Sequence, residues 1–365
     1  MNPFESFDMN KTRLRNRLAM APMTTYSGNP DHTPSEKELH YYALRSKDAG
    51  MVISAAVAIN EQAYAFDNQI ALENEGRIES LKPLAEAIKS DGAKAIAQLH
   101  HGGRMNEPHL YENQDDIVSA SAVKAPREGK VTPRAMEIHE IKQTVQDFKD
   151  AARRAMEAGF DGVELHGANT YLLQQFVSPH TNKRTDEYGG TREKRMRFIR
   201  EIAEETQKVI KAYGGILGYR FSPEEIEEDG LTMEDTLDLV ETLKNYDFDY
   251  LHVSLRRYDQ SSMREKRDET PLVLKIQSVL NKAIPLMASG GISSKDDAMR
   301  AIEMGFDLMS VGFSLIADPR AIDKMQKGLP VDKTIDASTM PRNLYNRLSK
   351  YKENFEKNGF RFSDF

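Results

Sequence analysis

Residues 140–165, EIKQTVQDFKDAARRAMEAGFDGVEL, contain one complete helix–strand unit and decide our prediction of the fold. Apolar side chains recur every three or four residues from Glu140 to Ala158, which predicts an amphipathic helix. Gly159 follows at the position where a glycine commonly ends a helix. The apolar run Gly162–Leu165 then predicts a short buried strand. A strand that follows a long helix in this way is the repeating unit of an α/β protein.

Similar units repeat along the whole chain. Short apolar runs alternate with longer amphipathic segments, which predicts parallel strands joined by helices. The candidate strands are Leu18–Ala21, Met51–Ala55, Ala95–Leu99, Gly162–Leu165, Ile216–Arg220, Tyr250–Val253, Pro285–Ala288 and Leu308–Val311. The candidate helices are Ser35–Ala49, Glu79–Asp91, Glu140–Ala158, Arg192–Tyr213, Thr232–Asn245, Pro271–Leu280, Ser294–Met304 and Pro319–Lys327. Alternation alone also fits an open doubly wound sheet, and the count of eight strands favours a single (β/α)8 TIM barrel.

Helix start and stop signals accompany several of these segments. Thr232 and Asp235 have the spacing of a capping box, and Ser293 and Asp296 have the same spacing. Glycines follow the predicted ends of other helices, and we expect them to act as C-terminal caps. These glycines are Gly50, Gly92, Gly159 and Gly305.

Two connections are too long to be simple turns. His100–Glu137 follows the third strand, and His166–Thr191 follows the fourth. Long ordered loops after barrel strands usually build or cover the active site. The first loop is polar and contains Pro108, Pro126 and Pro133, and we expect it to form a small hairpin or a lid.

The chain is expected to divide into a large barrel and a short tail. We predict the barrel over residues 1–330 and a C-terminal helical extension over residues 331–365. Within the extension, the sequence predicts a helix at Pro341–Lys357.

The bulk composition excludes several classes of protein. The 365 residues include 50 basic and 57 acidic side chains, and the net charge of −7 argues against a general nucleic-acid-binding surface. The chain has no cysteine, which excludes disulfides, cysteine nucleophiles, thiolate zinc sites and iron–sulfur clusters. No apolar run reaches the roughly eighteen residues of a membrane-spanning helix, and Met1–Lys11 lacks an apolar signal core. We therefore expect a cytoplasmic protein.

Reactive and small residues gather just past the predicted strands, where the chemistry of an α/β barrel takes place. After the first four strands these are Ala21-Pro22-Met23-Thr24, Ala56, Gln98 with His101, and His166 with Asn169 and Tyr171. After the later strands they are Arg220, Gly290-Gly291 and Gly312. Adjacent His100 and His101 would point to opposite sides of a strand, so we expect no metal ion between them. The acidic run at residues 224–229 is expected to be a solvated loop.

Several of these residues fall in motifs that resemble the old yellow enzyme family of FMN-dependent ene-reductases and NAD(P)H–flavin oxidoreductases. The resemblance runs from Phe4 to about Ala317. Its markers are Asn16-Arg17 with Ala21-Pro22-Met23-Thr24, Gln98-Leu99 with Gly103-Arg104, His166-Gly167-Ala168-Asn169-Thr170-Tyr171-Leu172, Ser178-Pro179, Arg184-Thr185-Asp186-Glu187-Tyr188-Gly189-Gly190, and Gly290-Gly291. The block at residues 184–190 together with the segment at residues 166–172 is highly specific, whereas a Gly-Gly pair alone is weak evidence.

The resemblance implies non-covalent FMN and a set of residues that hold it. For the flavin ring they are Ala21, Pro22, Met23, Thr24 at O4, Ala56, Gln98 at the pyrimidine edge, and Arg220 near N1 and O2. For the phosphate they are Gly290, Gly291, Gly312 and Phe313. The family usually has arginine where this chain has Phe313. Backbone donors alone, or another basic residue such as Arg256 or Arg257, would then hold the phosphate.

The resemblance also implies the catalytic residues. His166 and Asn169 would both donate to one carbonyl oxygen of the substrate and polarise it. Tyr171 would supply the proton that accompanies hydride transfer. Tyr26 and His101 are expected to line the substrate pocket with His166 and Asn169. Thr170 stands where the family commonly has glycine.

These residues lead to one main hypothesis and two rivals. In the main hypothesis NADH or NADPH reduces FMN, which then passes hydride to an α,β-unsaturated carbonyl, a quinone or a nitro compound in a ping-pong cycle. No GxGxxG fingerprint follows an early strand, so the nicotinamide would bind transiently at the flavin face. The rivals are a flavin-free barrel lyase, aldolase or isomerase with a phosphorylated substrate, and a non-catalytic FMN-binding protein. We expect no nucleic-acid or membrane partner, and a homo-oligomer stays open.

Overall fold

The computed structural model describes residues 1–363 and contains a closed barrel of eight parallel strands. The barrel strands in chain order are β3 (Leu18–Met20), β4 (Met51–Ala58), β5 (Lys94–His100), β8 (Gly162–Gly167), β9 (Ile216–Phe221), β10 (Tyr250–Val253), β11 (Leu286–Ser289) and β12 (Leu308–Val311). Each strand pairs with the next, and β12 pairs with β3 to close the ring. The eight predicted strands and the barrel fold are therefore confirmed.

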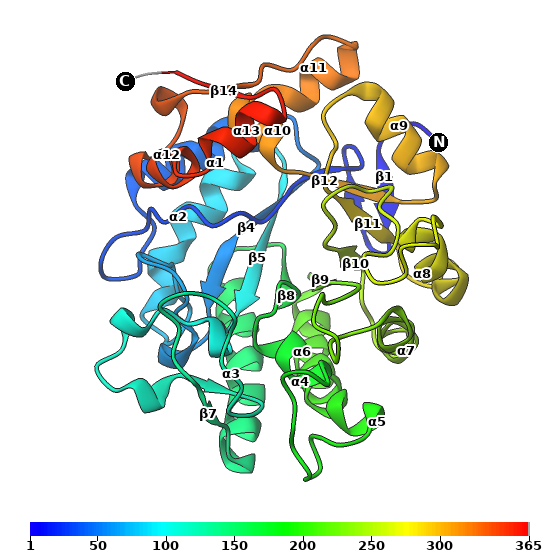
Figure 1. Cartoon of the computed structure of the whole chain (residues 1–365). Coiled ribbons are helices and arrows are strands. Elements are labelled where there is room, and N and C mark those ends of the chain that lie inside the picture. The colour runs from blue at the N-terminus through cyan, green and yellow to red at the C-terminus, as the bar shows by residue number, and fades with distance from the viewer. Residues whose placement is uncertain (364–365) are drawn as a thin grey trace.

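Helices cover the outside of the barrel (Figure 1). They are α1 (Glu36–Ser46), α2 (Arg77–Lys89), α3 (Ile138–Glu157), α6 (Arg197–Tyr213), α7 (Met233–Leu243), α8 (Leu272–Leu280), α9 (Lys295–Glu303) and α11 (Ala321–Lys327). Two short helices, α4 (Leu172–Val177) and α10 (Phe313–Ala317), follow barrel strands and were not predicted. The predicted helix at 192–213 is divided at Met196 into α5 (Arg192–Arg195) and α6.

The interior of the barrel changes from apolar to polar along the strands. Inward-facing Ile96, Ile216 and Leu308 pack with Met9 and Leu14 of the hairpin β1 (Phe7–Met9) and β2 (Thr12–Leu14), which closes the amino end. Because side chains alternate along a strand, the next inward positions on these strands lie two and four residues further on. These positions hold Gln98 and His100, Gly218 and Arg220, and Ser310 and Gly312. Polar groups therefore collect at the carboxyl end.

The loop after β5 is ordered but is not a hairpin. It contains the short helices η2 (Gly103–Met105), η3 (Pro108–Leu110) and η4 (Gln114–Asp116), and the strands β6 (Val118–Ser119) and β7 (Arg134–Ala135). β6 and β7 pair in parallel, so the predicted hairpin is wrong. Arg184, which forms a 2.6 Å ion pair with Asp186, donates to the carbonyls of Ala120 and Met136 and joins this loop to the one after β8.

Helix ends follow the predicted signals with two exceptions. Thr232 and Asp235 form the expected capping box on α7. On α9 the cap is Ser294, which accepts from Asp297 N, so the predicted pair at 293 and 296 is wrong by one residue. Gly50 is also not a cap, because α1 ends at Ser46. A Cβ at Gly50 would lie 2.4 Å from the carbonyl oxygen of Asn16, so this glycine permits a close approach of two backbones.

The C-terminal segment packs on the barrel next to α1 and α10 (Figure 1). It contains β13 (Thr334–Ile335), η5 (Ala337–Thr339), α12 (Arg342–Ser349), α13 (Lys352–Lys357) and β14 (Arg361–Phe362), and β13 pairs in parallel with β14. The single helix predicted at 341–357 is thus two helices. Buried Arg45 donates to the carbonyls of Leu315, Ile316 and Thr339 and so ties α1 to α10 and to this segment.

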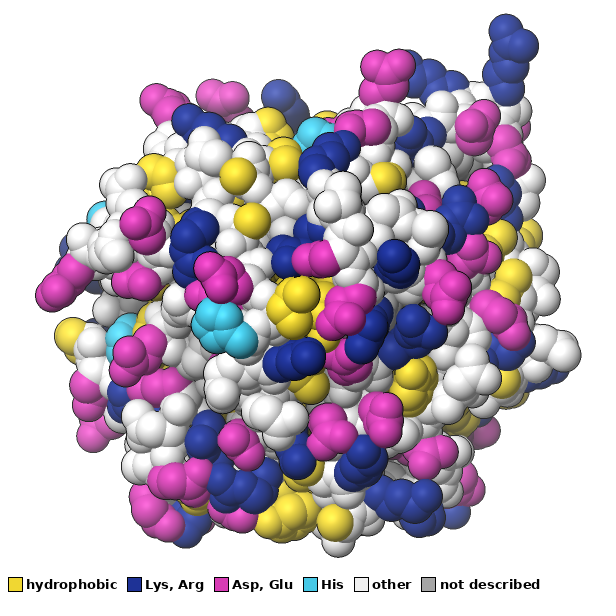
Figure 2. Space-filling model, turned by 90° about the horizontal axis from the view of Figure 1, so that it is seen from below, with side chains coloured by type: hydrophobic (Ala, Val, Ile, Leu, Met, Phe, Trp, Pro, Cys, Tyr) yellow, Lys and Arg dark blue, Asp and Glu magenta, His cyan; other side chains and the backbone are white. Residues whose placement is uncertain are grey.

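The surface carries charges of both signs. Figure 2 shows acidic and basic side chains interspersed over the face that it presents. Across residues 1–363, no helix has both the length and the apolar character needed to cross a membrane.

Candidate active site

Aromatic rings from four chain segments meet at the carboxyl end of the barrel. The ring of Tyr171 lies 4.9 Å from that of His166 and 4.4 Å from that of His100, measured between centroids. Phe66, in the loop after β4, contacts Tyr171 at 6.0 Å and Tyr26 at 5.7 Å. The structure therefore brings the predicted residues 26, 166 and 171 together. It adds His100 and Phe66, which the sequence reasoning did not place in the pocket.

His166 is held as a neutral hydrogen-bond donor. Burial, followed by the nearby His100, Arg220 and His252, lowers the pKa of His166 well below its ordinary value of 6.5. The backbone N–H of Ala168 donates to Nδ1 at 3.3 Å, which requires this nitrogen to be unprotonated. The single ring proton therefore lies on Nε2, so Nε2 is the donor.

Asn169 is oriented through its side-chain oxygen. The hydroxyl of Ser254 donates to Oδ1 at 3.1 Å, and Arg220 Nη2 donates to the same hydroxyl at 3.1 Å. This arrangement leaves the amide Nδ2 of Asn169 as a donor for another group. The backbone of Asn169 has φ 57° and that of Thr170 has φ 63°. Both lie in the left-handed region, which accounts for the glycine that relatives commonly have at position 170.

His100, rather than His101, lies in the ring cluster. Alternation along β5 puts His100 on the same side as Gln98. The Nδ1 of His101 instead accepts from Gly103 N at 3.1 Å, and none of the ring contacts between described residues joins His101 to His166 or Tyr171. Nε2 of both histidines is buried without a hydrogen-bond partner among residues 1–363, so the ring contacts alone distinguish them. We therefore transfer the pocket role expected of His101 to His100.

The segment after β3 lies against the ends of its neighbouring strands. A Cβ at Gly312 would lie 3.5 Å from the sulfur of Met23 and 3.8 Å from Cβ of Ala21. Ala21 N also donates to Val311 O at 3.0 Å. Pro22 is buried, Thr24 is half-buried, and Ala56 on β4 is the register partner of Gln98. The structure thus gathers the residues expected around the flavin ring.

A chain of hydrogen bonds lies beneath these residues inside the barrel. Gln98 Nε2 donates to Glu164 at 2.7 Å, which leaves its Oε1 as a free acceptor. The other oxygen of Glu164 lies 2.9 Å from His252 Nδ1, and His252 Nε2 lies 2.8 Å from the Ser310 hydroxyl. Burial alone would raise the pKa of Glu164, but the nearby His252 and Arg220 outweigh it and lower that pKa.

The residues present fit an FMN molecule. Arg220 Nε is buried without a hydrogen-bond partner among the described residues, as expected of a donor whose acceptor is a cofactor. Gly290 and Gly291 have φ 89° and 78°, and a Cβ at Gly290 would lie 2.5 Å from the Arg256 backbone. This turn therefore requires glycine and presents bare backbone, as a phosphate site needs. FMN supplies hydride transfer chemistry when it is bound.

Phe313 does not take part in this turn. Its ring is 53% exposed and packs edge-on against Phe355 at 4.9 Å, with Phe360 at 6.3 Å. Both partners belong to the C-terminal segment. The aromatic side chain at this position thus packs on the C-terminal segment, and the part of Phe313 in phosphate binding stays a prediction.

Two glutamates of the predicted solvated loop are buried. Glu225 accepts from Gln174 at 2.6 Å and from Leu231 N at 3.0 Å. Glu224 accepts from the Ser262 hydroxyl at 2.7 Å. The interpretation of residues 224–229 as a wholly solvated loop is therefore wrong, because Glu224 joins this loop to the one after β10 and Glu225 joins it to α4.

Glu38 on α1 forms a hydrogen bond with the segment after β3. Its side chain is fully buried and accepts a short hydrogen bond from the hydroxyl of Thr25, next to Thr24. Burial raises the pKa of Glu38 from 4.5 to about 7, against the opposing effect of Thr25. The folded protein therefore holds this proton more tightly than the unfolded chain does.

Replacing this side chain, Glu38→Gln, should remove a pH-dependent loss of stability. Below pH 4.5 both states of the wild type are protonated, and stability falls between pH 4.5 and about 7 as only the unfolded chain ionises. The pKa of Glu38 thus differs by about 2.5 units between the folded and unfolded states, and at about 1.4 kcal/mol per unit the loss of unfolding free energy is about 3 kcal/mol. Denaturant unfolding at pH 5 and pH 8 measures the loss in both proteins. The control Glu36→Gln changes an exposed residue of the same helix, and between pH 5 and pH 8 it should lose as much unfolding free energy as the wild type. If Glu38→Gln also loses as much as the wild type, the prediction is contradicted.

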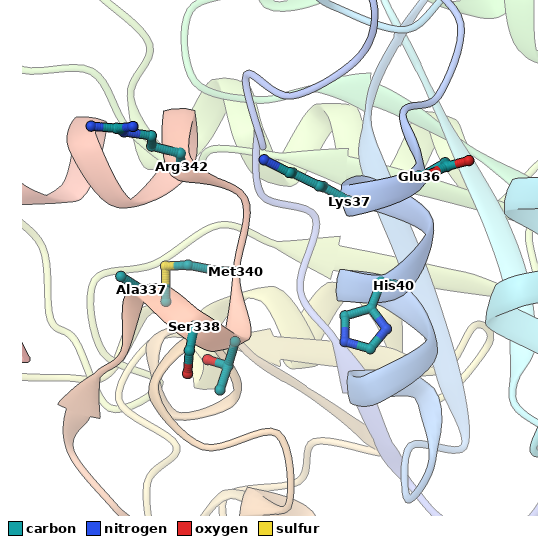
Figure 3. A pocket seen from close by; sticks show the side chains of 8 residues that line it. Glu36, Lys37, His40, Ala337, Ser338, Met340 and Arg342 are labelled. Atoms are coloured by element: carbon teal, nitrogen blue, oxygen red, sulfur yellow. The ribbon is translucent and has the colours of Figure 1, made fainter. Parts of the chain in front are cut away.

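A separate cavity of about 520 Å³ lies between α1 and the C-terminal segment (Figure 3). Glu36, Lys37 and His40 line it on one side, and residues 337–340 and 342 line it on the other. None of the residues expected to bind cofactor or substrate lines this cavity.

A closed barrel with hydrogen-bond donors for a flavin and a neutral histidine at its carboxyl end defines a flavin-dependent oxidoreductase. Residues 3–332 match the NADH:flavin oxidoreductase / NADH oxidase family, and the chain belongs to it. The old yellow enzyme homologue from Zymomonas mobilis has the same fold, with a TM-score of 0.82, 27% identity and coverage of 94% of this chain and 98% of that one. Morphinone reductase gives a TM-score of 0.80 at 27% identity, covering 93% and 92%.

Sequence relatives agree with this assignment. The probable NADH-dependent flavin oxidoreductase YqiG of Bacillus subtilis is 43% identical over 338 residues, which cover 90% of each chain. NADPH dehydrogenase of the same organism is 33% identical, covering 84% of this chain and 88% of that one. NADH:fumarate oxidoreductase of Klebsiella pneumoniae is 41% identical across 90% of this chain, which spans only 36% of that protein. The chain is thus an FMN oxidoreductase that uses NADH or NADPH.

Proposed function

We propose that this enzyme reduces activated C=C bonds of α,β-unsaturated carbonyl compounds, with quinones and nitro compounds as further acceptors. The observation that carries the proposal is the neutral His166, whose proton lies on Nε2 and whose ring contacts Tyr171. A neutral donor of this kind can bind a substrate carbonyl without protonating it.

His166 and Asn169 bind and polarise the carbonyl oxygen in this proposal. Both side chains have one polar atom fixed by the protein, Nδ1 in His166 and Oδ1 in Asn169, so each presents a defined N–H. Donors that are oriented before the reaction stabilise the negative charge that develops on the oxygen. His100 lies near the same rings, and Gln69 Nε2 lies 3.2 Å from its Nδ1.

Tyr171 holds the proton that the reduced substrate receives. Burial, the largest effect, raises the pKa of the Tyr171 phenol above its ordinary value of 10. The hydroxyl therefore stays protonated at every pH where the enzyme is expected to work. Tyr26 and Phe66 form the apolar side of the pocket through their ring contact.

Two assignments of the chain organisation belong to the same proposal. We assign FMN binding to a barrel at residues 1–330 and treat residues 331–365 as a helical extension. The match to the family, which ends at residue 332, supports this boundary.

An absorption spectrum of the purified protein tests the function first. We expect the two bands of an oxidised flavin between 300 and 550 nm, roughly the range in which flavins absorb. Under anaerobic conditions the bands should bleach after addition of NADPH or NADH and should recover after addition of cyclohexenone. Bleaching without recovery would contradict the proposed acceptor class. A colourless protein that cannot be reconstituted with FMN would contradict flavin chemistry altogether.

A further inference from the structure

The phosphate site of this chain lacks the arginine that its family usually has there. Phe313 occupies the position and packs on Phe355 of the C-terminal segment. A dianionic phosphate that is bound only by backbone N–H groups has no charged partner, whereas an arginine donates strong, charge-assisted hydrogen bonds to phosphate. A cation from another part of the chain would restore this pairing.

The loop after β10 brings such a cation to the glycine turn. Tyr258 N donates to Gly290 O at 3.1 Å, which fixes this loop against the turn after β11. A Cβ at Gly291 would lie 3.4 Å from Cγ of Arg257 and 3.7 Å from its Nη1. The guanidinium of Arg257 is therefore next to the bare backbone of Gly291.

The same turn adjoins the last glycine of the barrel. Ser289 and Ser310 are register partners on β11 and β12, and continuing this register sets Gly291 opposite Gly312. The Ser314 hydroxyl donates to Ile292 O at 3.0 Å and holds the two strand ends together. Arg257 thus lies beside Gly291, whose strand end adjoins the one that carries Gly312.

The guanidinium of Arg257 is held by Asp259 through two of its nitrogens, and its third nitrogen, Nη1, is left without a partner among residues 1–363. Nε and Nη2 of Arg257 donate to the two oxygens of Asp259, at 2.9 Å and 3.1 Å. Among residues 1–363, Nη1 has no hydrogen-bond partner, and Nη1 is the nitrogen nearest to Gly291. The side chain is 58% exposed, so a ligand at the surface can reach it.

We propose that Arg257 binds the phosphate of FMN and replaces the arginine that is missing at position 313. The proposal rests on FMN being the cofactor, and it adds a binding residue from a different loop. Arg256 does not share this role, because its backbone, rather than its side chain, approaches Gly290.

Flavin affinity tests the proposal directly, with riboflavin as the probe that lacks a phosphate. Dissociation constants of FMN and riboflavin are measured by fluorescence for the full chain, the Arg257→Ala variant and the Arg256→Ala variant. A hydrogen bond to a charged group contributes about ten- to hundredfold in affinity. We therefore expect Arg257→Ala to weaken FMN by about this factor and to leave riboflavin unchanged. Arg256→Ala, which removes the same charge one residue away, should leave both affinities unchanged within about twofold.

Three results would overturn the proposal. These are unchanged FMN affinity in Arg257→Ala, equal weakening of FMN and riboflavin, or equal weakening of FMN by both variants. The last result would indicate a long-range effect of charge instead of a contact. Failure of the wild type to bind either flavin would contradict the flavin assignment itself and is therefore distinguishable from these results.

Discussion

The Tyr171→Phe variant should reduce cyclohexenone at least a hundredfold more slowly than the wild type. The phenol is protonated, contacts the rings of His166 and His100, and is the proposed proton donor. A positioned general acid contributes about 10²–10⁴-fold to a rate. Reduction of the enzyme by NADPH requires no such proton, so its rate should stay within about twofold of the wild type. Stopped-flow absorbance of the two half-reactions measures both rates separately.

A second tyrosine provides the matched control for this prediction. Tyr219 on β9 is fully buried and its hydroxyl has no hydrogen-bond partner among the described residues, but its ring packs in the layer between strands and helices. Tyr219→Phe should therefore leave both half-reactions unchanged. Unchanged enone reduction in Tyr171→Phe would remove this residue from the mechanism. Burial raises the pKa of Tyr171 above 10, so the phenol stays protonated between pH 6 and pH 9. Over this range the rate of enone reduction by the wild type should therefore not fall through ionisation of Tyr171.

The barrel could be predicted from the sequence because each of its elements has a local signal. The strand at Gly162–Leu165 is marked by an apolar run, and the helix before it is marked by apolar residues every three or four positions. Both elements appear in the structure, with ends that differ from the prediction by at most two residues. Helix ends were less certain, since several residues compete for one cap. Ser293 and Ser294 both precede α9, and the structure selects Ser294 because its hydroxyl accepts from Asp297 N.

The residues of the pocket were predictable only in part. His166 and Tyr171 lie in a distinctive motif, but no motif marks Phe66, which reaches the pocket through a loop. His100 could have been chosen over His101 from the sequence, because the expected inward position of Gln98 fixes the side on which each histidine lies. The contact of Arg257 with Gly291 joins the ends of two neighbouring strands, so it depends on tertiary geometry that local patterns do not contain.

Glu164 is the strongest example of a residue that the sequence did not reveal. It lies in an apolar run, where a buried carboxylate is rare. The structure explains it through Gln98 and His252, which bind its two oxygens, and through the nearby charge of Arg220. Glu164 therefore orients the amide that is expected at the pyrimidine edge and balances the positive charge of Arg220.

The Glu164→Leu variant should lose about 2–6 kcal/mol of unfolding free energy, because each of two buried donors left without its acceptor costs about 1–3 kcal/mol. The leucine would leave Arg220 without its counter-charge and would leave Gln98 Nε2 and His252 Nδ1 without an acceptor in the fully buried interior. Denaturant unfolding of both proteins at saturating FMN measures the loss. Glu164→Gln, which keeps the size and one acceptor oxygen, should lose clearly less than Glu164→Leu. A loss below about 1 kcal/mol in Glu164→Leu would mean that the desolvation of this carboxylate already cancels its interactions.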